Sequence, residues 1–138
     1  MLKKIAVFVL VVTGLCMMWV CYNMPVFFDE AKSYDLYLKS DSSDALIVST
    51  DFIGALFTNG VRGISCNTAR EGFDLYAFLK KHSAKQVFTE TFKGGVNYYA
   101  YSPRIKYCKY IRGEKINLQV SVTENCITLG SPIIYGSF

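Results

Sequence analysis

Residues 116–123 read INLQVSVT, and apolar and polar residues alternate through this stretch without a break. Successive side chains of a β-strand point to opposite faces, so the pattern predicts a strand that packs on one face and meets water on the other. Its polar side chains are then either solvated or a docking surface: Asn117, Gln119, Ser121 and Thr123. Glu124-Asn125 predicts a turn into a second strand over 126–129, which Gly130 and Pro132 bend or end.

A second hairpin is predicted just before this one. Residues 85–92 and 96–101 are rich in β-branched and aromatic side chains, and Lys93-Gly94-Gly95 between them suits a tight turn. Pro103 lacks a backbone N–H and ends the second strand.

One helix is expected N-terminal to that hairpin. Thr68 and Glu71 have capping-box spacing, although Gly72 weakens the first turn and allows a start near Phe73. Its packing stripe follows the i, i+3, i+4, i+7 rule: Leu75, Phe78, Leu79 and His82.

Residues 45–66 predict a third hairpin. Residues 46–48 and 52–57 are strand candidates, and Asn59-Gly60 is a hairpin turn signal that leads into a return strand over 61–66. The order of elements predicts an α+β domain at 45–138, a small antiparallel sheet packed on one helix.

The N-terminus predicts a membrane segment. Lys3 and Lys4 precede the uncharged run 5–28, and charge returns at Asp29-Glu30. At 1.5 Å per residue these residues reach roughly 36 Å, enough for a hydrocarbon core of about 30 Å. The positive flank predicts an internal N-terminus, so the rest of the chain would be extracytoplasmic.

We expect an uncleaved single-pass signal anchor over 1–28, because small residues at the −3 and −1 positions of a cleavage site are not evident. The alternative is a cleaved signal peptide and a secreted domain. Residues 29–44, with a polar run at 40–44, are predicted to form a linker.

Composition limits the chemistry. The chain after the anchor has 13 of the 15 basic residues and 11 acidic ones, a balance that argues neither for nor against a nucleic acid partner. Because the domain is expected to be exported, no nucleic acid partner is expected. The single histidine, His82, and the absence of a C-x-x-C spacing predict no metal site, and no cofactor is expected. Cys66, Cys108 and Cys126 are expected to be small packed residues, with a Cys108–Cys126 disulfide as the alternative.

Residues 115–122 (KINLQVSV) and 127–134 (ITLGSPII) resemble the C-terminal signature of the YwmB-like family from spore-forming bacteria. Residues 73–79 (FDLYAFL) and 98–102 (YYAYS) resemble it too. The resemblance implies a fold like the TATA-box-binding protein, of which this short chain would keep one half. It also implies an exported or membrane-anchored protein without an assigned reaction, with a sporulation or cell-wall role. DNA binding does not follow from the fold.

The strongest candidate for a binding site is the segment 104–115. It holds five cations and two tyrosines against one acid, a composition that suits an anionic wall polymer or lipid headgroups. The candidate residues are Arg104, Lys106, Tyr107, Lys109, Tyr110 and Arg112. Alternatively, these cations merely keep a solvated strand or loop soluble.

Catalysis is the other function class considered. His82 could serve as base to Cys66 or Ser65 in an exported hydrolase or thiol enzyme, but its place on the helix stripe favours a structural role. We therefore expect a non-catalytic, membrane-anchored domain that binds a cell-envelope component or a partner protein.

Overall fold

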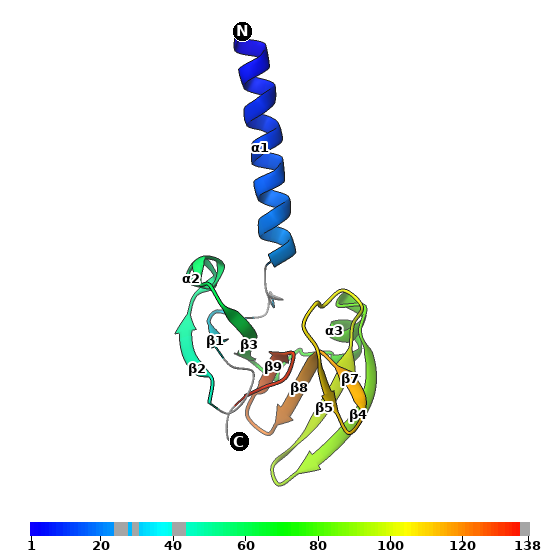
Figure 1. Ribbon diagram of the computed structural model, residues 1–138. Helices are drawn as coiled ribbons and strands as arrows, with labels where there is room; N and C mark the ends of the chain where they lie inside the picture. The colour runs from blue at the N-terminus through cyan, green and yellow to red at the C-terminus, as the bar shows by residue number, and fades with distance from the viewer. Residues whose placement is uncertain (24–27, 29–30, 40–43, 136–138) are drawn as a thin grey trace.

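The computed structural model describes residues 1–23, 28, 31–39 and 44–135. Helix α1 (Leu2–Asn23) extends away from a domain that contains the other elements (Figure 1). Along the chain these are β1 (Tyr34–Leu38), β2 (Leu46–Thr50), α2 (Phe52–Phe57), β3 (Val61–Thr68), α3 (Leu75–Lys81), β4 (Lys85–Phe92), β5 (Gly95–Tyr101), β6 (Lys109–Ile111), β7 (Glu114–Ile116), β8 (Leu118–Thr123) and β9 (Ile127–Ser131).

Seven strands form one antiparallel sheet in the order β2-β1-β3-β9-β8-β5-β4. Strands β6 and β7 pair only with each other among the described residues. An α+β fold with an apolar N-terminal helix is therefore confirmed. The sheet carries two helices rather than the one expected.

The hydrophobic core lies on the face of the sheet that both short helices cover, which we call the helix face. Alternate residues of five strands point into it, because paired residues of neighbouring antiparallel strands share a face. They meet side chains from α2, α3 and residue 28. The buried members are Phe28, Tyr34, Leu36, Ala55, Ile64, Cys66, Phe78, Leu79, Ala100, Ile105, Leu118, Val120, Ile127 and Leu129.

The segment expected to be a linker contains an interior strand of the sheet, next to the edge strand β2. Strand β1 lies between β2 and β3, and Tyr34, Leu36 and Tyr37 are buried. The short pattern YDLYL places large side chains on both faces, so it lacks the polarity of an exposed tether. Residues 40–43, the centre of the expected linker, and Asp29-Glu30 lie outside the described residues.

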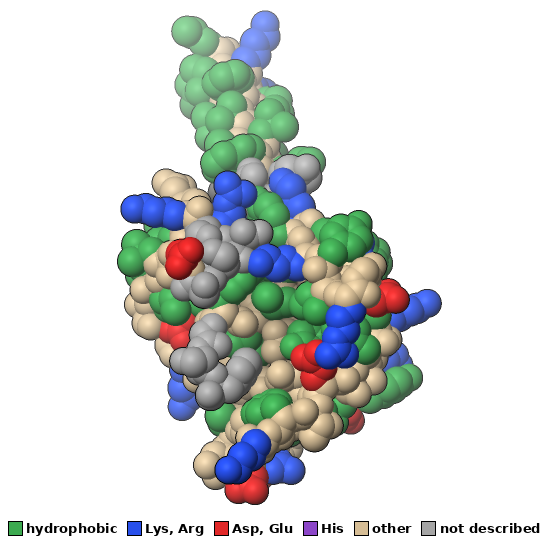
Figure 2. All heavy atoms as spheres, turned by 60° about the horizontal axis from the view of Figure 1, so that its bottom comes forward, with side chains coloured by type: hydrophobic (Ala, Val, Ile, Leu, Met, Phe, Trp, Pro, Cys, Tyr) green, Lys and Arg blue, Asp and Glu red, His purple; other side chains and the backbone are tan. Residues whose placement is uncertain are grey.

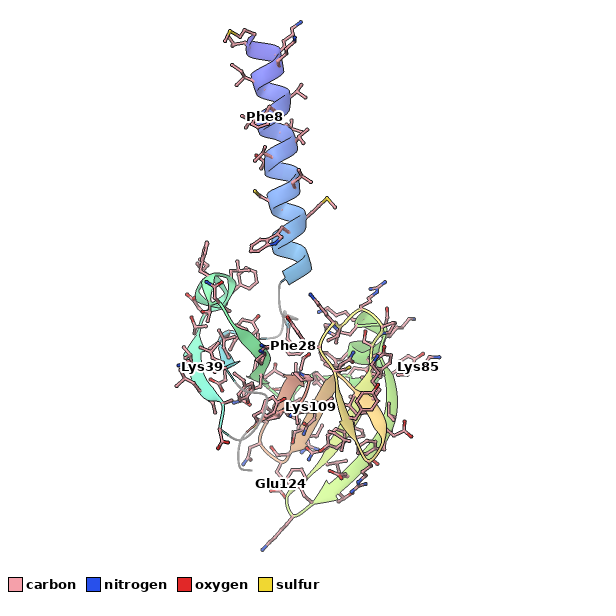
Figure 3. The ribbon with its side chains drawn as sticks, viewed as in Figure 1. Phe8, Phe28, Lys39, Lys85, Lys109 and Glu124 are labelled. Atoms are coloured by element: carbon pink, nitrogen blue, oxygen red, sulfur yellow. The ribbon has the colours of Figure 1, made fainter. Side chains whose placement is uncertain are left out.

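Phe28, expected at the end of the anchor, belongs to the domain. Its side chain is 0% exposed, and its ring centroid lies 5.9 Å from that of Phe78 and 5.7 Å from that of His82. Its carbonyl oxygen accepts a hydrogen bond from the hydroxyl of Tyr34 at 2.8 Å. Figure 3 shows Phe28 between the end of α1 and the sheet.

Residues 52–57 form helix α2, so the strand predicted there is wrong. Asp51 caps the helix, because its Oδ1 accepts a hydrogen bond from the Gly54 N–H at 2.8 Å. The Asn59-Gly60 pair consequently joins a helix to β3 rather than two strands, and Gly60 still adopts a positive φ of 75°. Strand β2 pairs with β1 instead.

The helix predicted after residue 68 is present as α3, but it begins later than the capping box implies. Asp74 caps it by accepting the Ala77 N–H at 3.1 Å. Thr68 is the last residue of β3 and cannot act as a helix cap. The hairpin of β4 and β5 and the hairpin of β8 and β9 are both confirmed.

The second face of the sheet is covered rather than solvated, so both expectations for the polar residues of 116–123 are wrong in part. Asn117, Gln119 and Ser121 are at most 3% exposed. The C-terminal residues fold back over this face: Ile134 N–H donates to Gln119 Oε1 at 2.9 Å, and a Cβ on Gly130 would lie 2.5 Å from Ile134 Cγ1. Asn117 and Gln119 hydrogen-bond main-chain atoms of other segments, whereas Ser121 Oγ is buried without a hydrogen-bond partner in the described part of the chain.

Candidate functional site

The basic segment 104–115 divides into an exposed loop and a hairpin. Residues 109–116 form β6 and β7, joined by Arg112 and Gly113 with φ of 54° and 81°. Two successive positive φ values are typical of a type I′ hairpin turn. The Arg112-Gly113 pair is the sequence signal for this turn. It is harder to recognise than Asn-Gly or Asp-Gly, because the residue before the glycine is neither Asn nor Asp.

Three cations of the hairpin lie against aromatic rings of the domain. Lys109 Nζ is 4.8 Å from the ring centroid of Tyr135, and Arg112 Cζ is 5.5 Å from that of Phe88. Lys115 Nζ lies 5.1 Å from the ring of Tyr101, and its interaction with that hydroxyl raises the pKa of Lys115. These cations help hold the hairpin on the second face of the sheet.

Arg112 also belongs to a network centred on Glu90. Glu90 Oε1 forms an ion pair with the guanidinium of Arg112, and Glu90 Oε2 accepts the hydroxyl proton of Tyr99 at 3.0 Å. The ring of Tyr99 stacks on Phe88 at 4.5 Å. Burial, followed by the hydrogen bond to Glu90, raises the pKa of Tyr99 to about 12. The network has a structural role, since each member contacts another strand or the hairpin.

The loop before the hairpin presents the remaining candidate residues to solvent. Arg104 and Lys106 are exposed, and Tyr107 is 42% exposed beside Lys106, whose Nζ lies 5.7 Å from its ring. Ile105 points into the core and fixes the loop. Tyr110 follows in β6 and is 71% exposed.

Ser102 and Asn117 hold this loop beside α3. Ser102 Oγ donates to the carbonyl oxygen of His82 at 2.6 Å, at the end of α3. Asn117 Oδ1 accepts the Ser102 N–H at 2.7 Å, and Asn117 Nδ2 donates to the carbonyls of Ser102 and Ile105 at 2.7 and 3.0 Å. Of the six candidate residues, Lys109 and Arg112 contact side chains of the domain. The loop offers Arg104, Lys106 and Tyr107, and Tyr110 adds an exposed ring.

Positive charge does not gather elsewhere on the face that Figure 2 shows. Lysine and arginine side chains are dispersed over it and interspersed with acidic ones, whereas the visible side of α1 is almost wholly hydrophobic. The loop is thus a local site rather than part of a large electropositive field.

The residues considered for catalysis lie in the core or on opposite faces. Cys66 is 2% exposed and packs on the helix face. Ser65 points to the opposite face, where its Oγ lies 2.7 Å from the hydroxyl of Tyr37, so it cannot pair with His82. His82 packs its ring 4.7 Å from that of Phe78. This arrangement gives a substrate no access to the Cys66 thiol.

The cysteines Cys66, Cys108 and Cys126 are free thiols, so the Cys108–Cys126 disulfide considered from the sequence is wrong. Cys66 is buried and the other two are half-buried, as small packed residues should be. Within the described residues, no group of three His, Cys, Asp or Glu side chains could hold a metal ion.

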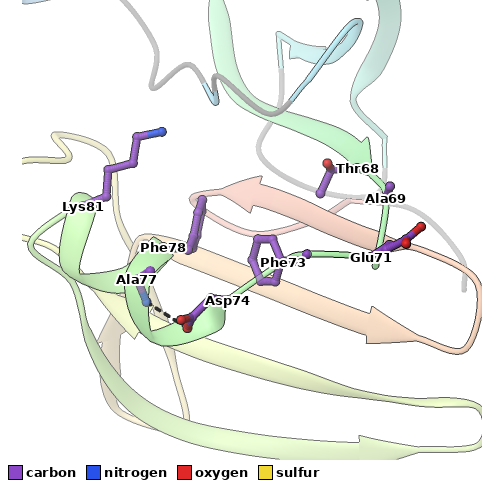
Figure 4. Close-up of a pocket in the computed structure, with 9 residues that line it drawn as sticks. Thr68, Ala69, Glu71, Phe73, Asp74, Ala77, Phe78 and Lys81 are labelled. Carbon is purple, nitrogen blue, oxygen red and sulfur yellow. Dashed lines mark hydrogen bonds between the residues drawn. The ribbon is translucent and has the colours of Figure 1, made fainter.

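A surface pocket of about 320 Å³ lies between the end of β3 and α3 (Figure 4). Phe73 and Phe78 form an aromatic wall with ring centroids 5.5 Å apart. The carboxylate of Asp74 is engaged as the cap of α3. Glu71 and Lys81 bring opposite charges, so the pocket favours neither anions nor cations. Its lining is Thr68, Ala69, Glu71, Gly72, Phe73, Asp74, Ala77, Phe78 and Lys81, and includes neither Cys66 nor His82.

Comparison of the chain with protein-family models, with curated proteins and with solved structures finds no match. The function must therefore be argued from the geometry of the chain itself.

Proposed function

We propose that the chain is a membrane-anchored, non-catalytic extracytoplasmic domain that binds an anionic polymer of the cell envelope through its 104–110 loop. The membrane anchoring is supported by helix α1. It is the helix of the described chain that is long and apolar enough to cross a membrane, and none of the window Leu2–Trp19 is buried. A signal sequence has the same composition, in which case the domain would be released.

The orientation follows from the charges at the two ends of the membrane segment. Lys3 and Lys4 precede it, and lysine and arginine favour the cytoplasmic side. The domain then lies outside the cytoplasm, where DNA is absent and anionic wall polymers and lipid headgroups are present.

Binding is assigned to this region because its two leading cations and both of its tyrosine rings are exposed, whereas Lys109 and Arg112 of the hairpin lie against rings of the domain. Arg104 and Lys106 supply positive charge, and Tyr107 and Tyr110 supply contact area. Ile105 and Ser102 hold the loop in place, so little ordering is required on binding. Lys109 and Arg112, also candidates from the sequence, are assigned to holding the hairpin.

Membership of the YwmB-like family and a fold like the TATA-box-binding protein remain part of this proposal. They are supported by the quoted residues 115–122 and 127–134 and by one continuous antiparallel sheet with its helices on a single face. A sporulation or cell-wall role would follow from that membership.

Cosedimentation with purified cell-wall material tests the binding surface. The double variant Arg104→Glu/Lys106→Glu should pellet less than the parent protein, and binding by the parent should weaken as salt is raised. The matched control is Lys85→Glu/Lys93→Glu, which makes the same charge change at exposed positions on β4 and its turn. Equal pelleting of the two double variants would refute a site at the loop.

A further inference from the structure

Helix α2 presents large apolar side chains to the outside of the domain. Phe52, Ile53 and Phe57 are 47%, 63% and 81% exposed, whereas Ala55 is the residue it buries in the core. The helix has no charged residue, and the carboxylate of Asp51 at its start is engaged in capping. Clustered apolar residues at a surface indicate an interaction site rather than ordinary solvent exposure.

The domain is tied closely to the end of α1. Asn23 ends the helix, and the buried Phe28 follows five residues later. At no more than about 3.6 Å per residue, this connection spans at most about 18 Å. A helix of 22 residues is about 33 Å long, close to the thickness of a hydrocarbon core, so Asn23 lies near the outer membrane interface.

Phe28 enters the domain on the helix face, the face that carries α2 and α3. It shares the core with Ala55 of α2 and Phe78 of α3. Figure 1 shows α2 and α3 at the end of the domain from which α1 leaves. The short connection therefore turns the side with α2 toward the bilayer.

We propose that α2 inserts Phe52, Ile53 and Phe57 into the outer interface of the membrane that α1 spans. The inference rests on the membrane anchoring in the proposed function and is independent of polymer binding by the loop. The three exposed side chains offer roughly 380 Å², taking about 200 Å² for each full side chain. A stable protein dimer needs about 800 Å² from each partner, so a second copy would find too little surface here.

Two contacts with the membrane would fix the orientation of the domain. With α1 alone, the membrane holds the domain at a single point. With α2 inserted as well, the loop at Arg104 and Lys106 is held at a constant height above the headgroups. Aromatic rings such as Phe57 suit this position because interfaces accept amphipathic helices with one apolar side.

The test places a tryptophan on α2 in the full chain, reconstituted into vesicles of phosphatidylcholine and phosphatidylglycerol. In a Trp19→Phe background, the Phe57→Trp variant should show blue-shifted emission that brominated lipid tails quench. The matched control is Lys93→Trp in the same background, an exposed position in the turn between β4 and β5, which should be neither shifted nor quenched. Phe57 and Lys93 are both exposed, so both variants should fold.

A further sample, the parent chain with its native Trp19, reports on the anchor. If Trp19 is quenched and the Phe57→Trp probe is not, α1 spans the bilayer and the inference about α2 is overturned alone. If neither tryptophan is quenched, α1 does not span the bilayer, and both the membrane anchoring and the inference about α2 are refuted. A blue shift at the Phe57→Trp probe that depends on protein concentration and not on brominated lipid would assign α2 to protein contacts and overturn the proposal.

Discussion

Replacing Phe28 by alanine should destabilise the domain strongly, although this residue lies at the end of a run that the sequence assigns to the membrane. Its side chain is fully buried against Phe78 and His82. Truncation of a buried phenylalanine costs about 3–5 kcal/mol, because apolar contacts are lost and a cavity remains. Single domains are typically stable by about 5–15 kcal/mol, so the loss is a large share of the total.

Urea unfolding of the full chain in detergent micelles measures this loss. For an m-value of about 2 kcal/mol/M, the midpoint of domain unfolding should fall by roughly 2 M. Phe57→Ala is the matched control, because Phe57 is 81% exposed and its truncation should change stability by no more than about 0.5 kcal/mol. Equal midpoints for the two variants would refute the placement of Phe28 in the core. The connection to α1 would then be longer, and it would no longer turn α2 toward the bilayer.

Two further predictions concern the second face of the sheet. Asn117→Ala should lower the free energy of unfolding by about 1–3 kcal/mol, because it leaves buried hydrogen-bonding groups of residues 102–105 unsatisfied, and hydrogen exchange at the Ser102 amide should accelerate. Asn125→Ala, in an exposed turn, is the control. Unchanged protection of the Ser102 amide in Asn117→Ala would count against the assigned role. Tyr99 has a pKa of about 12 in the fold against an ordinary value of 10.0, so the unfolded chain loses this proton first. The contribution of Tyr99 to stability is therefore intact below pH 10 and is lost as the pH rises through about 12. Urea midpoints measured across that window should fall less steeply in Tyr99→Phe than in the parent, and parallel curves would contradict the buried hydrogen bond to Glu90.

Several elements could be predicted because their signals are local. The apolar run of α1 is identified by composition and length, and the hairpin of β4 and β5 by the glycines at its turn. The stripe of α3 also follows from the spacing of Leu75, Phe78 and Leu79 alone. In each case the side chains that decide the structure lie within one turn or one hairpin of each other.

The errors occur where distant parts of the chain decide the outcome. Residues 52–57 are apolar enough for a strand, but the cap at Asp51 and packing of Ala55 on the core favour a helix. Strand β1 lies between β2 and β3. It is short and its neighbours in the sequence are polar, so the sequence does not indicate that these two strands pair with it.

The candidate site divides in the same way. Its composition, cations beside tyrosines, is a property of the sequence. The tertiary structure decides that Lys109 and Arg112 lie against Tyr135 and Phe88, because those rings are remote from them in sequence. It also leaves Arg104 and Lys106 exposed. It also decides that Gln119 and Ser121 are buried. Alternation separates the two faces of a strand, but only the folded chain determines whether something covers the polar one.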